Sequence, residues 1–383
     1  MAVLNDEQAM LKDMAAGWAQ ERMPVTALRA LYDHGGGGKP DSPGYDPAAW
    51  SEMAEMGWTG ILVPEEFGGS DFGYLSMGLV LEELGRTLAA SPLLSSGLAA
   101  ITALRLGGSS GQKARWFPTI VDGSAIGTLA IDEGPHRALE KTALAATRSD
   151  DGWTLKGVKR AVQDGMIADF AILSARTSGV PGDREGLTLF LVETSAQGLS
   201  REVMDQIDAR RPAIFTLADV HVGNDAILGE PGKGADLLDA ILDRANAGLA
   251  AEMLGSATQA FETTLDYLKT RVQFDAVIGS FQALQHRAAR MFGELQLARS
   301  AIEAALLAID EGDADIPALS SLAKAMAGEM LQLISSEMVQ LHGGIGMTHE
   351  HDAGLYLKRA RVAEQCFGGT AWHRERWARL RGY

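Results

Sequence analysis

The chain has 383 residues, which is too long for one ordinary hydrophobic core and fits two or three associated domains. Hydrophobic residues make up 46% of it, a share typical of globular rather than disordered proteins. Its formal net charge of -16 argues against nucleic acid as a partner, because a phosphate backbone needs a basic face.

The single cysteine, Cys366, excludes a disulfide within the chain and suits a reducing cytoplasm. The first residues, Met1 to Glu7, are not basic and no continuous apolar stretch follows them, so we expect no signal peptide. No apolar run approaches the roughly 20 residues that a membrane-spanning helix needs. We therefore expect a cytoplasmic protein without a membrane partner.

The first block, residues 1–122, has a helical pattern. Apolar and charged residues alternate at helical spacing over residues 4–33, and the glycine run at 35–38 then interrupts the pattern. The periodicity returns at residue 46 and predicts a long amphipathic helix over about 74–88, with further helix over 95–118. We expect an N-terminal helical domain.

The second block, residues 123–230, has short β-type runs separated by turn residues. The runs cover residues 127–131, 153–155, 170–173, 187–192 and 220–222. This texture predicts an antiparallel β-barrel or sandwich.

The third block, residues 231–383, is dominated by Ala, Leu, Met and Glu in long helical patterns. Helices are predicted over about 235–271, 280–310, 316–342 and 350–365, which together favour a C-terminal four-helix bundle. The predicted fold is therefore mostly α with a central β-domain.

Four segments resemble one known family. They are Val63-Pro-Glu-Glu-Phe-Gly-Gly69; Tyr267 to Phe274 with Ile278 to Gln282; Gln340-Leu-His-Gly-Gly-Ile-Gly-Met347; and Leu355 to Ala360. The Gln340 to Gly344 part is followed about two dozen residues later by Phe367-Gly-Gly-Thr370. They resemble the acyl-CoA dehydrogenase superfamily, and the resemblance extends over nearly the full length with the same order of domains. The closing Phe367 to Arg376 segment is most similar to paralogues of steroid side-chain degradation, some of which work as heteromeric pairs.

This resemblance implies FAD-dependent α,β-dehydrogenation of an acyl-CoA thioester within a dimer or tetramer whose subunits share flavin sites. It also implies electron-transferring flavoprotein as the electron acceptor. The implied cofactor-binding residues are Arg271, Gln273, Phe274, Phe281, Gln282, Gln340, Gly343, Gly344 and Thr370.

The residue types suit these implied roles. A guanidinium matches phosphate oxygens with its fork of donors, although Arg271 could instead form a surface ion pair at a helix end. Gly343 and Gly344 would let the backbone approach a pyrophosphate, and a helix C-cap is compatible with that role.

The chain departs from the family pattern at the catalytic base. Gly368 stands where the family has the Glu that removes the α-proton, and the second family location, counted back from Gly255, falls on Ala245. Glu252 shares a helix face with Ala245, about 10 Å further along. Its apolar neighbours could raise a carboxyl pKa, so Glu252 is the candidate base. The alternative is a buried acid paired with an Arg or a backbone group.

The β-domain departs as well. In the stretches that match the family's flavin contacts, Ala161 replaces a stacking Trp and Gln163 replaces a hydroxyl donor. These changes and Gly368 favour an alternative function: a catalytically incomplete subunit that supports a heteromeric acyl-CoA dehydrogenase. Other chemistry on the same scaffold, such as an acyl-CoA oxidase, also stays open.

The cluster His349-Glu350-His351-Asp352 invites a metal interpretation. Two His residues two positions apart do not share a helix face, and no His-Glu-x-x-His spacing is present. We therefore predict no metal site.

Overall fold

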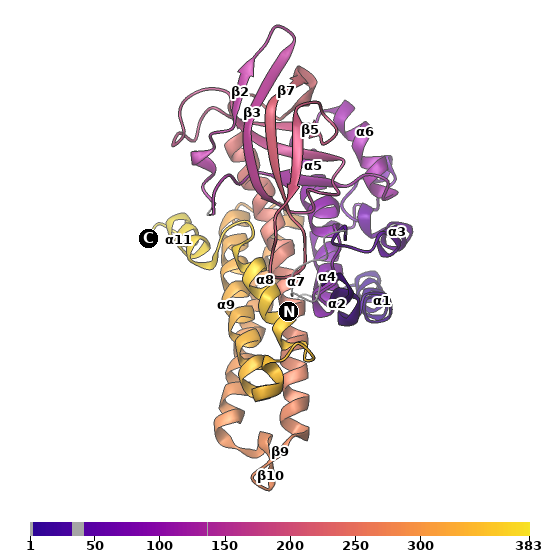
Figure 1. Cartoon of the computed structure of the whole chain (residues 1–383), viewed down its shortest axis with the longest axis vertical. Coiled ribbons are helices and arrows are strands. Elements are labelled where there is room, and N and C mark those ends of the chain that lie inside the picture. Colours follow the sequence, from indigo (N-terminus) through magenta and orange to yellow (C-terminus); the bar gives the residue numbers. More distant parts are fainter. Residues whose placement is uncertain (1–2, 33–41, 136) are drawn as a thin grey trace. The chain divides into compact units, whose positions relative to one another are not determined.

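The computed structural model describes residues 3–32, 42–135 and 137–383, so the glycine run at 35–38 lies outside the described residues (Figure 1). The chain forms two compact units. The first contains residues 3–30, Tyr74–Ala89 and Asn246–Tyr383, and the second contains the described residues of Leu31–Gly73 and Ala90–Ala245. The predicted blocks 1–122, 123–230 and 231–383 remain a division by sequence, because the first unit joins parts of the first and third blocks.

The first unit is helical. Its helices are α1 (Asp6–Arg22), α2 (Val25–Leu31), α4 (Gly73–Arg86), α7 (Gly234–Thr270) from Asn246 onward, α8 (Gln282–Glu311), α9 (Ile316–His342), α10 (Ala353–Gln365) and α11 (Thr370–Leu380). Helices α8, α10 and α11 all pack on α9, and Figure 1 shows the small hairpin of β9 and β10 beyond the ends of α7 and α8. Among the described residues, no helix is both long enough and apolar enough to cross a membrane.

Two glycines bring α4 and α7 into close contact. A Cβ atom added to Gly255 would lie 1.7 Å from the carbonyl oxygen of Glu82, and one added to Gly85 would lie 2.1 Å from that of Glu252. Both distances are far below van der Waals contact, so only glycine permits this approach. The backbones of the two helices therefore meet beside Glu82 and Glu252.

The second unit contains a sheet and short helices. Its helices include α3 (Pro47–Glu55), α5 (Ile101–Gly107), which follows a π-helical segment (Leu93–Ala100), α6 (Ser110–Val121) and the beginning of α7, up to Ala245. The strands are β1 (Gly127–Ala130), β2 (Ala145–Arg148), β3 (Gly152–Val162), β4 (Phe170–Arg176), β5 (Leu187–Glu193), β6 (Leu199–Val203), β7 (Ala213–Gly223) and β8 (Ile227–Leu228).

In the described part of this unit, the strands form one sheet in the order β6-β7-β3-β2-β4-β5-β8, with β1 paired to β4. Most neighbours are antiparallel, as predicted, but β1 and β2 both pair with β4 in parallel. The parallel pairs arise because crossover connections bring non-consecutive strands together. Apolar residues of β3, β4, β5 and β7 form the core, in which Phe190 and Phe215 are fully buried.

Candidate functional site

The segment after α7 forms an exposed hairpin. Strands β9 (Val272–Gln273) and β10 (Ala276–Val277) pair antiparallel, and Phe274 and Asp275 turn the chain with φ of 53° and 59°. Phe274 is 90% exposed and its ring centroid lies 6.4 Å from that of Phe281. Exposed aromatic rings at a tip mark a surface that suits contact with a ligand or another chain.

The glycines after α9 form an open turn. Gly343 has a φ of 64°, in the left-handed region that favours glycine. A Cβ atom added to Gly343 or Gly344 would meet no atom within 4 Å. The backbone of this turn is therefore accessible to a ligand.

Tyr267 joins the hairpin to the glycine turn. Its hydroxyl donates to the carbonyl oxygen of His342 at 3.4 Å, and the two ring centroids are 4.4 Å apart. Arg271 follows one helical turn later, and its backbone N–H donates to the carbonyl oxygen of Tyr267 at 2.9 Å. The structure therefore brings the two predicted cofactor-binding segments, 271–282 and 340–344, to the same end of the first unit.

Thr370 lies elsewhere in this unit. A Cβ atom added to Gly328, in the middle of α9, would lie 2.2 Å from its hydroxyl oxygen, so Thr370 packs directly on that helix. Gly328 precedes His342 by 14 residues, which corresponds to about 20 Å along the helix. Within one subunit, Thr370 is therefore remote from the other predicted cofactor-binding residues.

The turn that carries Gly368 has an unusual backbone. Phe367 has a φ of 58° and Gly368 a φ of 109°, and L side chains rarely adopt either conformation. Asn246 Nδ2 donates to the carbonyl oxygen of Phe367 at 3.5 Å, and His373 Nε2 lies 3.3 Å from the same atom. The buried Lys324 ammonium also contacts this turn. Gly368 therefore lies in a turn whose conformation would strain an L side chain at its position.

Glu252 lies in a buried ion pair. Its Oε1 atom accepts from Nη2 and Nε of Arg359 at 2.7 and 2.9 Å. Both side chains are buried, so each compensates the other's loss of hydration. The structure therefore contains the alternative that the sequence left open for Glu252, a buried acid paired with an Arg. Ala245, the second family location, is buried and apolar.

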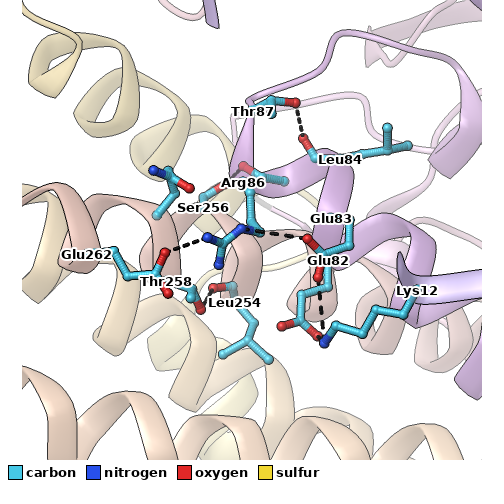
Figure 2. Close-up of polar contacts among 12 residues, drawn as sticks. Lys12, Glu82, Glu83, Leu84, Arg86, Thr87, Leu254, Ser256, Thr258 and Glu262 are labelled. Atoms are coloured by element: carbon cyan, nitrogen blue, oxygen red, sulfur yellow. Dashed lines mark hydrogen bonds and ion pairs between the residues drawn. The ribbon is translucent and has the colours of Figure 1, made fainter. Parts of the chain in front are cut away.

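A second charged cluster lies on α4, close to the point where that helix contacts α7. Lys12 donates to Glu82 at 3.1 Å and lies 3.6 Å from Glu83, while Arg86 reaches both Glu83 and Glu262 (Figure 2). Burial is the main cause that raises the pKa of Glu83, and the adjacent Glu82 carboxylate raises it further. These contacts join α1, α4 and α7.

In the second unit, a buried lysine fixes the loop after β1. Lys159 Nζ donates to Glu133 Oε1 at 2.7 Å, to the carbonyl oxygen of Ile131 at 3.1 Å and to Ser174 Oγ at 3.0 Å. Burial lowers the pKa of Lys159, although Glu133 opposes the shift. The same loop lines a pocket of about 340 Å³, where burial raises the pKa of Asp132.

The Ala161–Gly165 segment is a turn at the end of β3. Ala161 and Asp164 have φ of 50° and 52°. The Gln163 side-chain amide donates to the carbonyl oxygen of Ala161 at 3.2 Å. The amide that replaces the family's hydroxyl donor is thus engaged with its own turn.

The His349–Asp352 segment is held by side chains of the same unit. Arg29 donates to the carbonyl oxygens of His349 and Glu350 and pairs with Asp352 at 2.6 Å. His351 Nδ1 accepts from the backbone of Ala353 at 3.1 Å. Within the described residues, no group of three or more His, Cys, Asp and Glu side chains could hold a metal ion.

Family models for three parts of the acyl-CoA dehydrogenases match the chain. The N-terminal domain matches residues 5–124, the middle domain 133–216 and the C-terminal domain 232–380. The acyl-CoA dehydrogenase IpdE2 of Mycolicibacterium smegmatis is 30% identical over 366 residues, which cover 95% of this chain and 96% of that protein. The chain belongs to the acyl-CoA dehydrogenase family.

Solved structures of acyl-CoA dehydrogenases agree with this assignment. The butyryl-CoA dehydrogenase of Megasphaera elsdenii has a TM-score of 0.91 and 26% identity, over 99% of each chain. A variant of a steroid acyl-CoA dehydrogenase has a TM-score of 0.87 and 29% identity, over 98% of this chain and 97% of that one. The predicted acyl-CoA dehydrogenase fold is confirmed.

Acyl-CoA dehydrogenases are FAD flavoproteins, and the donor set at the end of the first unit fits such a cofactor. The side chains of Arg271, Gln273, Gln282 and Gln340 are all exposed there. A guanidinium and amides beside an open glycine backbone can bind phosphate oxygens, and the aromatic rings of the hairpin can pack on a planar ring.

No motif predicted a role for three buried residues of this acyl-CoA dehydrogenase fold, although one of them, Arg359, lies within the Leu355–Ala360 segment. Lys324, Arg359 and Asn246 are buried polar residues on helices whose other buried residues are mainly apolar. Their signal in the sequence was a charged or amide side chain at a core position of the helical pattern, which requires a buried partner.

Proposed function

We propose that this chain is a subunit of an FAD-dependent acyl-CoA dehydrogenase assembly in which a partner chain supplies the catalytic base. The observation that carries the proposal is the buried Glu252–Arg359 pair, at 2.7 Å, together with the missing side chain at Gly368. A carboxylate that is paired with a guanidinium is a weaker base, and its oxygen already accepts hydrogen bonds from that guanidinium. Both effects disfavour the uptake of a proton from a substrate.

The reaction is α,β-dehydrogenation of an acyl-CoA thioester. Bound FAD would supply the acceptor for a hydride from the β-carbon. The exposed Arg271 guanidinium would bind pyrophosphate oxygens, with Gln273, Gln282 and Gln340 as further donors. The open backbone at Gly343 and Gly344 would allow the dinucleotide to approach, and Phe274 and Phe281 would pack on it. Thr370 would contact a cofactor only as part of a different site.

The exposed hairpin supports an oligomer whose subunits share flavin sites. Phe274 is exposed at its tip, so a cofactor held there would also need a second surface to cover it. The assembly would be a dimer or tetramer, homomeric or heteromeric, and would pass its electrons to electron-transferring flavoprotein. A steroid-type acyl group is the substrate class supported by the Phe367–Arg376 resemblance and by the likeness to a steroid acyl-CoA dehydrogenase.

A second candidate is a complete enzyme in which Glu252 is the base. It is favoured by the position of Glu252, a buried carboxylate on α7 beside α4. This function would require Glu252 to separate from Arg359 during turnover.

Co-expression tests the proposal. The chain would be produced alone and together with each co-encoded homologue, and the flavin-to-protein ratio, subunit ratio and turnover of an acyl-CoA would be measured. We expect turnover only in a mixed assembly. Full turnover by the chain alone would refute the proposed division of labour.

A further inference from the structure

A buried lysine holds the end of α10 and the turn that follows it. Lys324 is 1% exposed, and its Nζ atom donates to the carbonyl oxygens of Glu364, Cys366 and Gly368 at 2.9, 3.0 and 3.0 Å. The last carbonyls of a helix have no partner within that helix, and a cation there also interacts favourably with the helix dipole. One side chain on α9 thus satisfies three backbone groups around the turn.

The turn needs such support because its backbone conformation is unfavourable. Phe367 has a φ of 58°, where a bulky L residue is strained and persists only if its surroundings fix it, whereas Gly368 adopts its φ of 109° without that strain. The contacts of Asn246 and His373 with the carbonyl oxygen of Phe367 add support from α7 and α11. Lys324 contacts residues on both sides of Phe367.

We propose that Lys324 is a positioning residue whose ammonium fixes the 364–368 backbone in the conformation that binds the acyl-CoA thioester. In this view the chain contributes a rigid backbone where other members of its family contribute a side chain. The link to acyl-CoA rests on the function proposed above, whereas the effect of Lys324 on the turn does not depend on it.

Hydrogen exchange tests the first part in the full chain without any ligand. Lys324→Met removes the ammonium but keeps an unbranched side chain, and Arg299→Met is the matched control. Arg299 is a largely buried cation of the same unit that pairs with Glu82 at 2.9 Å. We expect the amides of residues 364–370 to exchange at least about tenfold faster in Lys324→Met and unchanged in Arg299→Met, because charge-assisted hydrogen bonds are the strong ones. Unchanged exchange at 364–370 overturns the proposal.

The unmodified chain provides a second measurement if Lys324→Met does not fold. Its 364–368 amides should exchange at least about tenfold more slowly than those of the exposed turn at 343–345, because the supported turn opens less often. Equal rates overturn the proposal.

Ligand binding tests the second part. In the assembly, Lys324→Met should weaken binding of an acyl-CoA by about tenfold more than binding of free CoA, since only the acyl-CoA carries a thioester. Equal weakening of both ligands overturns the positioning role. If the unmodified assembly binds no acyl-CoA, the proposed function is overturned instead. The hydrogen-exchange measurement then decides whether Lys324 fixes the 364–368 backbone.

Discussion

Arg359 donates twice to one oxygen of Glu252, with Nη2 and Nε at 2.7 and 2.9 Å from Oε1. Both side chains are buried, at 6% and 7% exposure. One carboxylate oxygen thus accepts both hydrogen bonds from the guanidinium, whose positive charge compensates the charge of the carboxylate. This relationship links α7 to α10 through a buried ion pair.

Removal of one partner of this pair should be costly. Arg359→Met leaves a buried carboxylate without its cation, and we expect the free energy of unfolding to fall by about 3–5 kcal/mol. Urea denaturation of the two proteins measures this difference. The matched control is Arg374→Met, because Arg374 is 64% exposed and pairs with Glu329 on the surface; it should cost no more than about 1 kcal/mol. Equal losses in both variants would contradict a dominant role for the buried pair.

Gly368→Glu should not restore a catalytic base. The φ of Gly368 is 109°, where an L side chain is strained, so we expect a loss of about 1–3 kcal/mol in stability and no gain in turnover. Gly368→Ala carries the same backbone strain without a carboxylate and is the control. Acyl-CoA-dependent flavin bleaching by Gly368→Glu but not by Gly368→Ala would show that the turn accepts a base.

Much of the fold was predictable because long apolar patterns identify long helices. The ranges predicted for α7 to α10 agree with the structure to within about three residues. Strand β2 escaped because it has only four residues, of which Ala146 alone is buried. Helix α11 escaped because most of its residues are polar, yet His373 and Arg376 are buried within it. Tertiary contacts with α9 stabilise α11, and no local sequence pattern reveals these contacts.

The charged cluster on α4 should make stability depend on pH. Burial, together with the neighbouring Glu82 carboxylate, raises the pKa of Glu83 above its ordinary value of 4.5. A carboxyl group with a raised pKa stabilises the folded state while it is protonated, and this contribution is lost as the pH rises through the raised pKa.

Glu83→Gln cannot ionise, so it should remove this dependence. The stability of the variant relative to the unmodified chain should increase from pH 4.5 toward neutral, by no more than about 1.4 kcal/mol per pH unit. Urea denaturation over a pH series measures the difference. A difference that stays constant across the series would contradict the assigned cause.

Arg271 should affect flavin content without affecting the fold. Its side chain is exposed, so Arg271→Met should change the free energy of unfolding by no more than about 0.5 kcal/mol. Loss of a charge-assisted contact to phosphate should nevertheless lower the FAD content of the purified assembly, measured as the ratio of flavin to protein absorbance. Lys269→Met, at a nearby exposed cation, is the control and should keep the normal ratio.

The candidate site was predictable only where it is local in sequence. The hairpin and the glycine turn are short motifs, and Tyr267 then explains why they lie together. The partners Glu252 and Arg359 are 107 residues apart, and Lys324 lies more than 40 residues from Cys366. Such pairs depend on helix packing, which spacing along the chain does not specify.

In the proposed assembly, this chain lacks a catalytic base of its own. The most direct measurement is anaerobic addition of an acyl-CoA to the purified chain loaded with FAD, with the flavin absorbance band followed over time. We predict no bleaching by the chain alone and full bleaching by the mixed assembly. Bleaching by the chain alone that disappears in Glu252→Gln would contradict the account and identify Glu252 as the base.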